Sequence, residues 1–449
     1  MNSHSLAALL WFGSVGVSLA GSIFWTDRAT GARAVRRMGL NGSAATTTVP
    51  LIGLAGSADP RGIAVDAAAG KLYFGSNSQI LQANLDGTGT VAKVAGLTAV
   101  RDVKFDEPSG YLYWADQTAG NLQRALVSDF VVSGGYAKVA SDSYYLDIYR
   151  GAGNFAEPMI LWGNSAGSYW VTSTNVALTG ASSAYSGGNN VRGVCVDGPN
   201  QMIYWNEKDA KMVRRAKLKA NLEIDLTTVQ NLYTGLNAPH GLVLDLGARK
   251  LYWVDSGTNG STGFGRSGVN RGDMDGSGAA EALIGPTSTV NSFSGQPWDL
   301  DLDVRCGTFA EWQARFFRND ALTSQTGTSA DPDSDGLSNW AEYALGSPPL
   351  GSNPEAPSRA LVVQDAGQSF PAIESTRRSG ASDVTYLVQV AEGTSGWLDN
   401  VSQPVPAVTV EVSSVSVGEG MVRVVTRSTK PLEAAGKQFL RVVMNGAGN

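Results

Sequence analysis

The sequence of 449 residues contains little cysteine, histidine or charge. Two cysteines cannot form the disulfide framework of a small secreted scaffold or a cysteine-rich zinc site. Two histidines, one of them His4, exclude most metal chemistry that uses histidine ligands. Only 16% of the residues are charged and the net charge is −6, so the composition excludes a general nucleic-acid binder, which needs clustered Lys and Arg.

Glycine is abundant, with 54 residues, and apolar residues make up 43% of the chain. The apolar content is sufficient for folded cores, while the glycine content indicates many turns. The length allows two or three domains. The composition therefore favours a turn-rich, β-rich protein over a helical one.

The N-terminus carries an apolar stretch, LAALLWFGSVGVSLA, at residues 6–20. It is shorter than the roughly 20 residues that a membrane span needs, and its last positions include the small residues Ser18 and Ala20. We expect residues 1–20 to be a signal peptide, with a buried N-terminal segment as the alternative. This predicts a secreted protein in the extracellular space or at the cell surface, with the periplasm also open. We expect no membrane-spanning segment.

A short pattern recurs six times: an aliphatic residue, an aromatic pair or its remnant, then a small or acidic residue. Copies include LYWAD at residues 112–116 and LYWVD at residues 251–255. The third position is occupied by Trp25, Phe74, Trp114, Trp162, Trp205 and Trp253, which lie 40 to 49 residues apart. Strand-like sequence with this period is typical of β-propeller blades.

An alternating apolar segment precedes every copy except the first, as in GIAVD at residues 62–66. Period-two alternation predicts a strand, and the short turn that follows predicts a hairpin. A last alternating segment, WDLDLD at Trp298–Asp303, has no aromatic copy after it. We therefore predict that residues 297–304 supply the missing inner strand of the first blade, beside residues 23–27, and close a six-bladed ring.

Over roughly residues 23–304 these motifs resemble the YWTD propeller of low-density-lipoprotein-receptor-type proteins. The resemblance implies a six-bladed binding platform that engages protein ligands on one face. The copies LYFGS at 72–76 and ILWGN at 160–164 depart from the pattern, and no EGF-like cysteine module flanks the repeat, so the receptor role is not implied. We expect the repeat tryptophans to pack between blades and the repeat aspartates to cap turns.

Residues 331–342, DPDSDGLSNWAE, fit the pattern of a calcium loop, with Gly336 at the sharp turn. The expected Ca²⁺ ligands are Asp331, Asp333, Asp335, the Leu337 carbonyl, Asn339 and Glu342. Oxygen-only ligands suit Ca²⁺ better than Zn²⁺. The segment resembles the dockerin and thrombospondin type 3 calcium loops of secreted bacterial proteins, which implies a structural ion. The alternative is a solvated acidic turn.

We predict an all-β protein with a propeller at residues 21–305, a helix–calcium loop–helix connector at 306–346 and a linker at 347–358. Strand-like runs separated by Gly, Ser and Pro predict a small β-sandwich at residues 359–449. This tail resembles C-terminal modules that follow such calcium segments in other exported bacterial proteins. Anchoring and carbohydrate contact both stay open for it.

The residues that begin the six inner strands are predicted to ring one mouth of the propeller channel. They are Arg61, Arg101, Tyr144, Arg192, His240 and Trp298. Three arginines, one histidine and two aromatic residues would attract an anionic or acidic-aromatic ligand. In the alternative interpretation they cover the channel and pair with Asp102, Asp299 or backbone carbonyls.

These features predict a secreted, non-enzymatic binding protein with a protein or glycan ligand and structural Ca²⁺. A hydrolase or lactonase-like propeller is the first alternative, but the mature chain has only His240, lacks a nucleophile-elbow motif and has a mainly basic predicted mouth, so we assign no catalytic residue. A structural cell-surface module without a small ligand is the second. The tripeptide at residues 271–273 resembles an integrin ligand but aligns with a blade strand. Cys195 and Cys306 are expected to be unpaired and buried.

Overall fold

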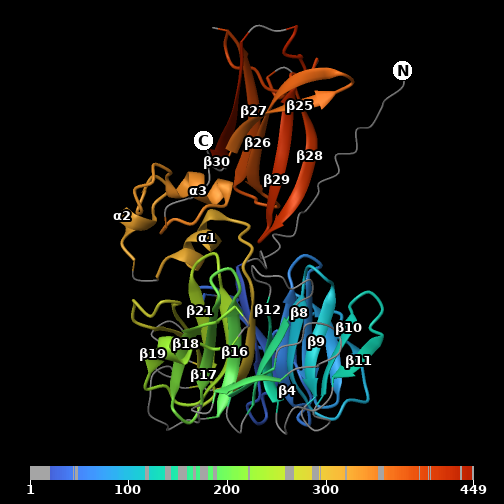
Figure 1. Cartoon of the computed structure of the whole chain (residues 1–449), viewed down its shortest axis with the longest axis vertical. Helices are drawn as coiled ribbons and strands as arrows, with labels where there is room; N and C mark the ends of the chain where they lie inside the picture. The colour runs from blue at the N-terminus through green and yellow to red at the C-terminus, as the bar shows by residue number, and fades with distance from the viewer. Residues whose placement is uncertain are drawn as a thin grey trace, which may run out of the picture.

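The computed structural model describes residues 21–43, 45, 49–116, 121–136, 143–149, 159–164, 168–171, 181–185, 190–220, 223–257, 267–285, 293, 295–318, 321–351, 358–393, 395–402, 404, 406–434 and 437–446. A propeller occupies one end of the molecule and a β-sandwich the other, with three short helices between them (Figure 1). Within these ranges no helix has the length and apolar character needed to cross a bilayer.

The propeller is all-β and has six blades of antiparallel strands (Figure 1). Blade 1 contains β24 (Pro297–Asp303), β1 (Ser22–Asp27), β2 (Ala34–Gly39) and β3 (Ile52–Gly53). Blade 2 contains β4 (Pro60–Asp66), β5 (Lys71–Ser76), β6 (Gln79–Asn84) and β7 (Val91–Val94). Blade 3 contains β8 (Val100–Asp106), β9 (Tyr111–Asp116), β10 (Asn121–Leu126) and β11 (Val132–Tyr136).

The remaining blades complete the circle. Blade 4 consists of two strand pairs, β12 (Ser143–Tyr149) with β13 (Met159–Asn164), and β14 (Ser168–Val171) with β15 (Ala181–Tyr185). Blade 5 contains β16 (Val191–Asp197), β17 (Met202–Glu207), β18 (Met212–Lys217) and β19 (Gln230–Thr234), with the 3₁₀ turn η1 (Leu226–Thr228). Blade 6 contains β20 (Pro239–Asp245), β21 (Lys250–Asp255), β22 (Gly268–Asp273) and β23 (Glu281–Ile284).

The ring closes where the sequence predicts it. Strand β24 pairs antiparallel with β1, with Ile23 opposite Leu302 and Trp25 opposite Leu300. The late segment therefore supplies the inner strand of the blade that the N-terminal strand begins. Strand β1 is therefore paired on both sides, with β24 and with β2.

An apolar cluster fills each of the six boundaries between neighbouring blades. The repeat aromatic residue of a blade packs against the blade before it: Trp205 lies with Tyr149 and Leu161, and Trp25 lies with Val254 across the closing boundary. The described repeat aromatics are fully buried, which confirms the interblade role predicted for them. The side chain of Trp162 lies outside the described part of the chain.

The repeat aspartates cap turns, as predicted. Asp116 accepts hydrogen bonds from the backbone N–H groups of Thr98 and Ala99, both at 2.8 Å. Asp255 accepts from Asn237 and Ala238, both at 2.7 Å. Each carboxylate thereby fixes the loop that leads into the inner strand of its own blade.

Three helices form the connector: α1 (Phe309–Phe316), α2 (Thr323–Thr326) and α3 (Asn339–Leu345). Helix α1 begins with a capping box between Thr308 and Glu311. Its Arg315 donates to both carboxylate oxygens of Asp245, at the end of β20, at 2.5 and 2.6 Å. Arg271 of β22, which is fully buried, donates to the carbonyl oxygens of Ala314 and Phe317.

The burial of Arg271 also decides how the tripeptide at residues 271–273 is interpreted. An integrin ligand has to present its arginine to solvent, whereas this side chain holds helix α1 against blade 6. The alignment of the tripeptide with a blade strand is therefore confirmed. Cys195 and Cys306 are both buried and unpaired, as expected.

The C-terminal unit has two sheets. The first has the order β25 (Ser358–Asp365), β26 (Gln368–Arg378), β29 (Met421–Ser428), β28 (Thr409–Gly418), and the second pairs β27 (Val384–Glu392) with β30 (Gln438–Gly446). The turn between β28 and β29 reaches both helix α1 and blade 6. Glu419 accepts a hydrogen bond from Arg315 at 2.8 Å, and a Cβ added to Gly247 would lie 2.9 Å from the Glu419 carboxylate. The sandwich therefore rests on the end of the propeller where the inner strands finish (Figure 1).

Candidate functional site

Each of the six inner strands starts with an irregular register, at the residue predicted to line the channel mouth. The shifts lie at residues 60–63, 100–102, 143–145, 191–194, 239–242 and 297–300. A β-bulge inserts an extra residue and changes the direction in which its side chain points. The mouth residues therefore leave the regular alternation of the strand just where the channel opens.

Trp298 is the centre of the mouth. The guanidinium carbon of Arg28 lies 4.2 Å from the centroid of its ring, and that of Arg61 lies 4.8 Å away. The imidazole of His240 lies 4.0 Å from the same ring, between centroids. Stacking of cations on an indole face is favourable by roughly 0.5–2 kcal/mol per contact. Arg28 directly follows β1, and the other three side chains come from three different inner strands, β4, β20 and β24.

Tyr145 joins this group from β12. Its hydroxyl donates to the carbonyl oxygen of Trp298 at 3.1 Å and lies 3.3 Å from His240 Nδ1. Burial, followed by the charges of Arg192 and its neighbours, holds the pKa of His240 well below its ordinary value. Burial likewise raises the pKa of Tyr145. Both groups are therefore neutral at physiological pH.

The mouth has an excess of positive charge. The charges of Arg192, Lys208, Arg28 and Arg101 all act on the His240 ring. Asp59 pairs with Arg61 at 2.7 Å and with Arg28 at 2.5 Å, so this carboxylate is shared between guanidinium groups. Within the described residues, Arg61 Nη1 is buried and has no hydrogen-bond acceptor, and the same holds for Trp298 Nε1.

The structure brings Arg61, His240 and Trp298 into contact, with Arg101 and Arg192 within electrostatic range. The side chain of Tyr144 lies outside the described part of the chain, and Tyr145 is the tyrosine that reaches the site. The sequence analysis also missed Arg28 and Asp59. Arg28 directly follows Asp27, the last residue of the first repeat copy. Comparing the residue after each repeat copy could have identified it as a candidate.

Asp102 and Asp299 each accept a backbone hydrogen bond from a neighbouring inner strand. Asp102 accepts the backbone N–H of Leu146 at 2.8 Å, and Asp299 accepts that of Ile63 at 3.1 Å. These carboxylates therefore connect neighbouring inner strands deeper in the channel. Arg61 pairs with Asp59, a carboxylate that the alternative interpretation did not include.

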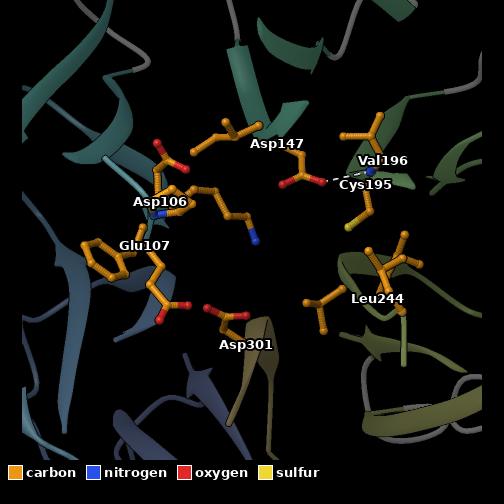
Figure 2. Close-up of a pocket in the computed structure, with 13 residues that line it drawn as sticks. Asp106, Glu107, Asp147, Cys195, Val196, Leu244 and Asp301 are labelled. Carbon is orange, nitrogen blue, oxygen red and sulfur yellow. Dashed lines mark hydrogen bonds between the residues drawn. The ribbon is translucent and has the colours of Figure 1, made fainter. Parts of the chain in front are cut away.

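Beyond this layer the channel becomes acidic. A cavity of about 270 Å³ opens there, and its walls include Lys104, Asp147, Asp301 and Cys195. Asp147 and Asp301 reach it from opposite sides in Figure 2, which also shows Val196 donating to Asp147. The backbone bonds that these carboxylates accept, 2.8 Å from Val196 to Asp147 and 2.8 Å from Val65 to Asp301, again bridge adjacent inner strands.

The ionisation of this cavity follows from burial. Burial raises the pKa of Asp147 to about 6 and raises the pKa of Asp301. Burial alone would lower the pKa of Lys104, but the carboxylates of Asp102, Asp299 and Asp301 hold it well above its ordinary value. Lys104 is therefore a charged ammonium that offsets part of the carboxylate charge. None of these residues was predicted to line the channel.

The predicted calcium loop is compact. Carboxylate oxygens of Asp331, Asp333 and Asp335 all lie within 4.8 Å of one another. The turn uses left-handed backbone at Ser334, with φ 60°, and at Gly336, with φ 94°. The N–H of Gly336 donates to Asp331 at 3.1 Å. This arrangement gathers negative charge that a hard cation would offset.

The remaining predicted ligands lie at the start of α3 or just before it. Leu337 donates its N–H to Asp335 at 2.9 Å, while Asn339 and Glu342 are fully buried. Asn339 donates through Nδ2 to the carbonyl oxygens of Gln325 and Gly327, and its Oδ1 has no hydrogen-bond partner among the described residues. A buried amide oxygen without a donor is costly unless a ligand satisfies it. The donor set therefore fits Ca²⁺.

Comparisons with known proteins give limited likenesses. No family model matches the sequence. Nidogen-2 of Mus musculus is 31% identical over 90 residues, which span 20% of this chain and 6% of nidogen-2. The crystal structure of a nidogen/laminin complex has a TM-score of 0.43 and 14% identity, covering 62% of this chain and 96% of that chain. Strand order and ring closure show a six-bladed propeller.

Proposed function

We propose that this protein is an exported, non-enzymatic binding protein that recognises a protein ligand at the mouth of its propeller. The ligand places a carboxylate, from an Asp or Glu side chain, against Arg61 and Trp298. The observation that carries this proposal is the buried Arg61 Nη1, which lacks an acceptor within the described residues and belongs to a guanidinium group that lies on the Trp298 ring, which Arg28 also contacts. A carboxylate supplies both the acceptor and the negative charge.

The position of the sandwich supports the choice of this end of the propeller. Arg315 and Asp245 fasten the connector to the opposite end, and Glu419 of the sandwich joins them. A Cβ added to Gly420 would lie 3.3 Å from the side chain of Arg305, which shows how closely the sandwich approaches there. A large partner therefore meets less obstruction at the mouth where the inner strands begin.

Binding to an array of blocked peptides tests this function. Each peptide is presented as a matched pair, with Asp or Glu in one member and Asn or Gln in the other, and the full chain is the probe. We expect binders only among acidic members, with at least tenfold weaker binding by Arg61→Gln. Lys217→Gln, a change at an exposed position on β18, is the control and should bind normally. Equal binding of both members of the pairs would contradict the proposal.

We further propose that Ca²⁺ binds the 331–342 loop and fixes the connector against the sandwich. Asp331, Asp333, Asp335, the Leu337 carbonyl, Asn339 and Glu342 would hold the ion. Support comes from the convergent carboxylates and from the buried Asn339 Oδ1. The ion would balance the negative charge of the loop. It would also coordinate Asn339 Oδ1, the buried oxygen in the first turn of α3.

Calorimetry and thermal melting test the calcium proposal. Extracellular sites often bind with Kd of roughly 10⁻⁴–10⁻³ M, so 10 mM Ca²⁺ should stabilise the loop by about 1.4–2.7 kcal/mol. Asp333→Asn should abolish the heat of binding, whereas Glu433→Gln, at an exposed site in the sandwich, should retain it. An unchanged melting curve in EGTA would contradict the proposal.

The enzymatic alternative has less support. The imidazole of His240 contacts Tyr145 and Trp298, which supply neither a hydroxyl nucleophile on an elbow nor a carboxylate. Among the described acidic groups, only Asp331, Asp333 and Asp335 come close enough together to share an ion. The channel carboxylates, in contrast, stand around Lys104.

A further inference from the structure

Strand β28 forms one edge of the larger sheet in the sandwich. It pairs with β29, and no other strand in the described part of the chain pairs with it. Its valines are exposed to solvent despite their apolar side chains: Val410 by 40%, Val412 by 41%, Val415 by 60% and Val417 by 43%. The free edge therefore offers backbone hydrogen-bonding groups next to apolar side chains.

Edge strands usually carry features that prevent pairing with another chain, such as Lys, Pro or inward charges. Between Thr409 and Gly418, Glu411 is the single charged residue, and neither Lys, Arg nor Pro occurs. The register shifts lie toward the ends, at 411–413 and 416–418, which leaves residues 413–416 regular. The opposite edge, β25, instead contains Arg359 and Asp365. The two edges of one sheet thus differ in charge, although the two register shifts shorten the regular part of β28.

The sequence of β28 is nearly self-complementary. Residues 410–417 read VEVSSVSV, and read backwards they give VSVSSVEV. In an antiparallel pair of two copies centred between Ser413 and Ser414, every valine faces a valine. The only mismatched positions are Glu411 and Ser416, which face each other. A two-fold axis requires such a self-complementary surface.

Charge also agrees with pairing of two copies. Glu411 of one copy would face the uncharged Ser416 of the other. The two Glu411 residues would be separated along the strands by five residues, or roughly 17 Å, which exceeds the Debye length of about 8 Å at physiological ionic strength. Like charges therefore do not oppose the assembly.

We propose that β28 pairs antiparallel with β28 of a second copy of this chain, which joins the two sandwich sheets into one continuous eight-stranded sheet. Two propellers would then be carried by one dimer. A dimer presents two mouths to its surroundings, so a partner with repeated sites would be bound more tightly than by one propeller alone. The pairing itself does not depend on the ligand proposed for the mouth.

Sedimentation velocity of the full chain over a concentration series tests the dimer. We expect a monomer–dimer equilibrium that Val415→Lys weakens at least tenfold, because the two-fold axis places the new charge against Val412 twice. The matched control is Val362→Lys, at the other edge of the sheet, where Val362 is 53% exposed. It should leave the equilibrium unchanged. Near-ultraviolet circular dichroism checks that both variants remain folded.

Cysteine pairs test the register. In the proposed pairing Ser413 faces Ser414, so the double variant Ser413→Cys, Ser414→Cys should give a disulfide-linked dimer under mild oxidation. The double variant Ser413→Cys, Ser416→Cys has no facing cysteines and should stay uncrosslinked. A chain that is monomeric at 100 µM, an open polymer that grows with concentration, or equal crosslinking of both variants would overturn the proposal.

Discussion

The propeller and the sandwich use similar strand sequences in opposite environments. In β16, VRGVCVD, every residue is buried, whereas in β28, TVEVSSVSVG, all residues between the first and the last are exposed. Both strands are rich in valine, with three in β16 and four in β28. The difference arises from the architecture, because the ring gives each inner strand two neighbouring blades, while the open sheet leaves β28 with one neighbour.

This contrast shows what ring closure contributes. Each blade boundary is filled from both sides, and the closing boundary is filled by a cluster that includes Trp25, Leu300 and Phe293. Closing the ring therefore buries the facing sides of the first and last blades and pairs β1 on both of its sides. The sandwich keeps an edge that further association could cover.

The largest expected difference is in the free energy of unfolding, between a substitution at a blade boundary and one on the exposed edge of the sandwich. Trp25 is fully buried at the closing boundary, where its ring meets Phe293 edge-on at 6.0 Å. Trp25→Ala should lower the free energy of unfolding by about 3–5 kcal/mol, through lost burial and the cavity left behind. Val415→Ala, on the exposed edge, should change it by under roughly 0.5 kcal/mol.

Urea denaturation at a protein concentration below that of association measures both variants. Tryptophan fluorescence and circular dichroism follow unfolding, and both signals include the connector and the sandwich, which contain Trp312, Trp340 and Trp397. If the two substitutions cost similar amounts, the closing boundary would not be a site of tight packing, and the contrast between the regions would be lost.

The ring can be predicted from the sequence because each repeat has a large aromatic residue and most repeats have an acidic residue at a fixed position. Each repeat aromatic has one boundary to fill and each repeat aspartate has one loop to cap, so spacing alone identifies the blades. Trp298–Asp303 could be assigned to the first blade because an inner strand without an outer partner has one vacant place in a ring.

The site is less predictable because the sequence does not reveal β-bulges. At the start of β12 the register shift decides that Tyr145 reaches His240, although alignment of the strands selects Tyr144. Lys104 and Asp147 alternate correctly with apolar residues, but two opposite charges in one channel layer can only be recognised once neighbouring strands are placed together. Asp59 lies in a loop, where no period applies.

The close approach of neighbouring inner strands gives a second test of the comparison. Its expected effect on stability is smaller than that of Trp25→Ala. A Cβ on Gly62 would lie 2.3 Å from the backbone nitrogen of Val103, so backbone would have to move. Gly62→Ala should destabilise the protein by roughly 1–3 kcal/mol, as overpacking does. Gly396→Ala, in the sandwich, meets nothing within 4 Å and should be neutral or slightly stabilising. Thermal melting of the pair checks this, and equal melting temperatures would contradict it.

Asp147 gives the smallest effect and one that depends on pH. Burial raises its pKa to about 6 in the folded protein, while the unfolded chain has a pKa near 3.9. Between these values the unfolded chain releases the proton first, so the group's cost to stability grows from about pH 4 to about pH 6 and is constant above. Asp147→Asn should remove this cost while its Oδ1 still accepts the N–H of Val196.

The stabilisation by Asp147→Asn should be on the order of 1 kcal/mol at pH 8, since solvent screens part of the shift at this partly exposed residue, and it should vanish near pH 4. Asp365→Asn, at an exposed carboxylate of the sandwich, is the matched control and should show no such dependence between pH 4 and 8. Urea unfolding of both variants and the parent chain at the two pH values measures the difference. An equal effect of Asp147→Asn at pH 4 and pH 8 would show that the channel carboxylate is not held in a poorly solvated place, and the buried inner face would then resemble the open sheet in its electrostatics.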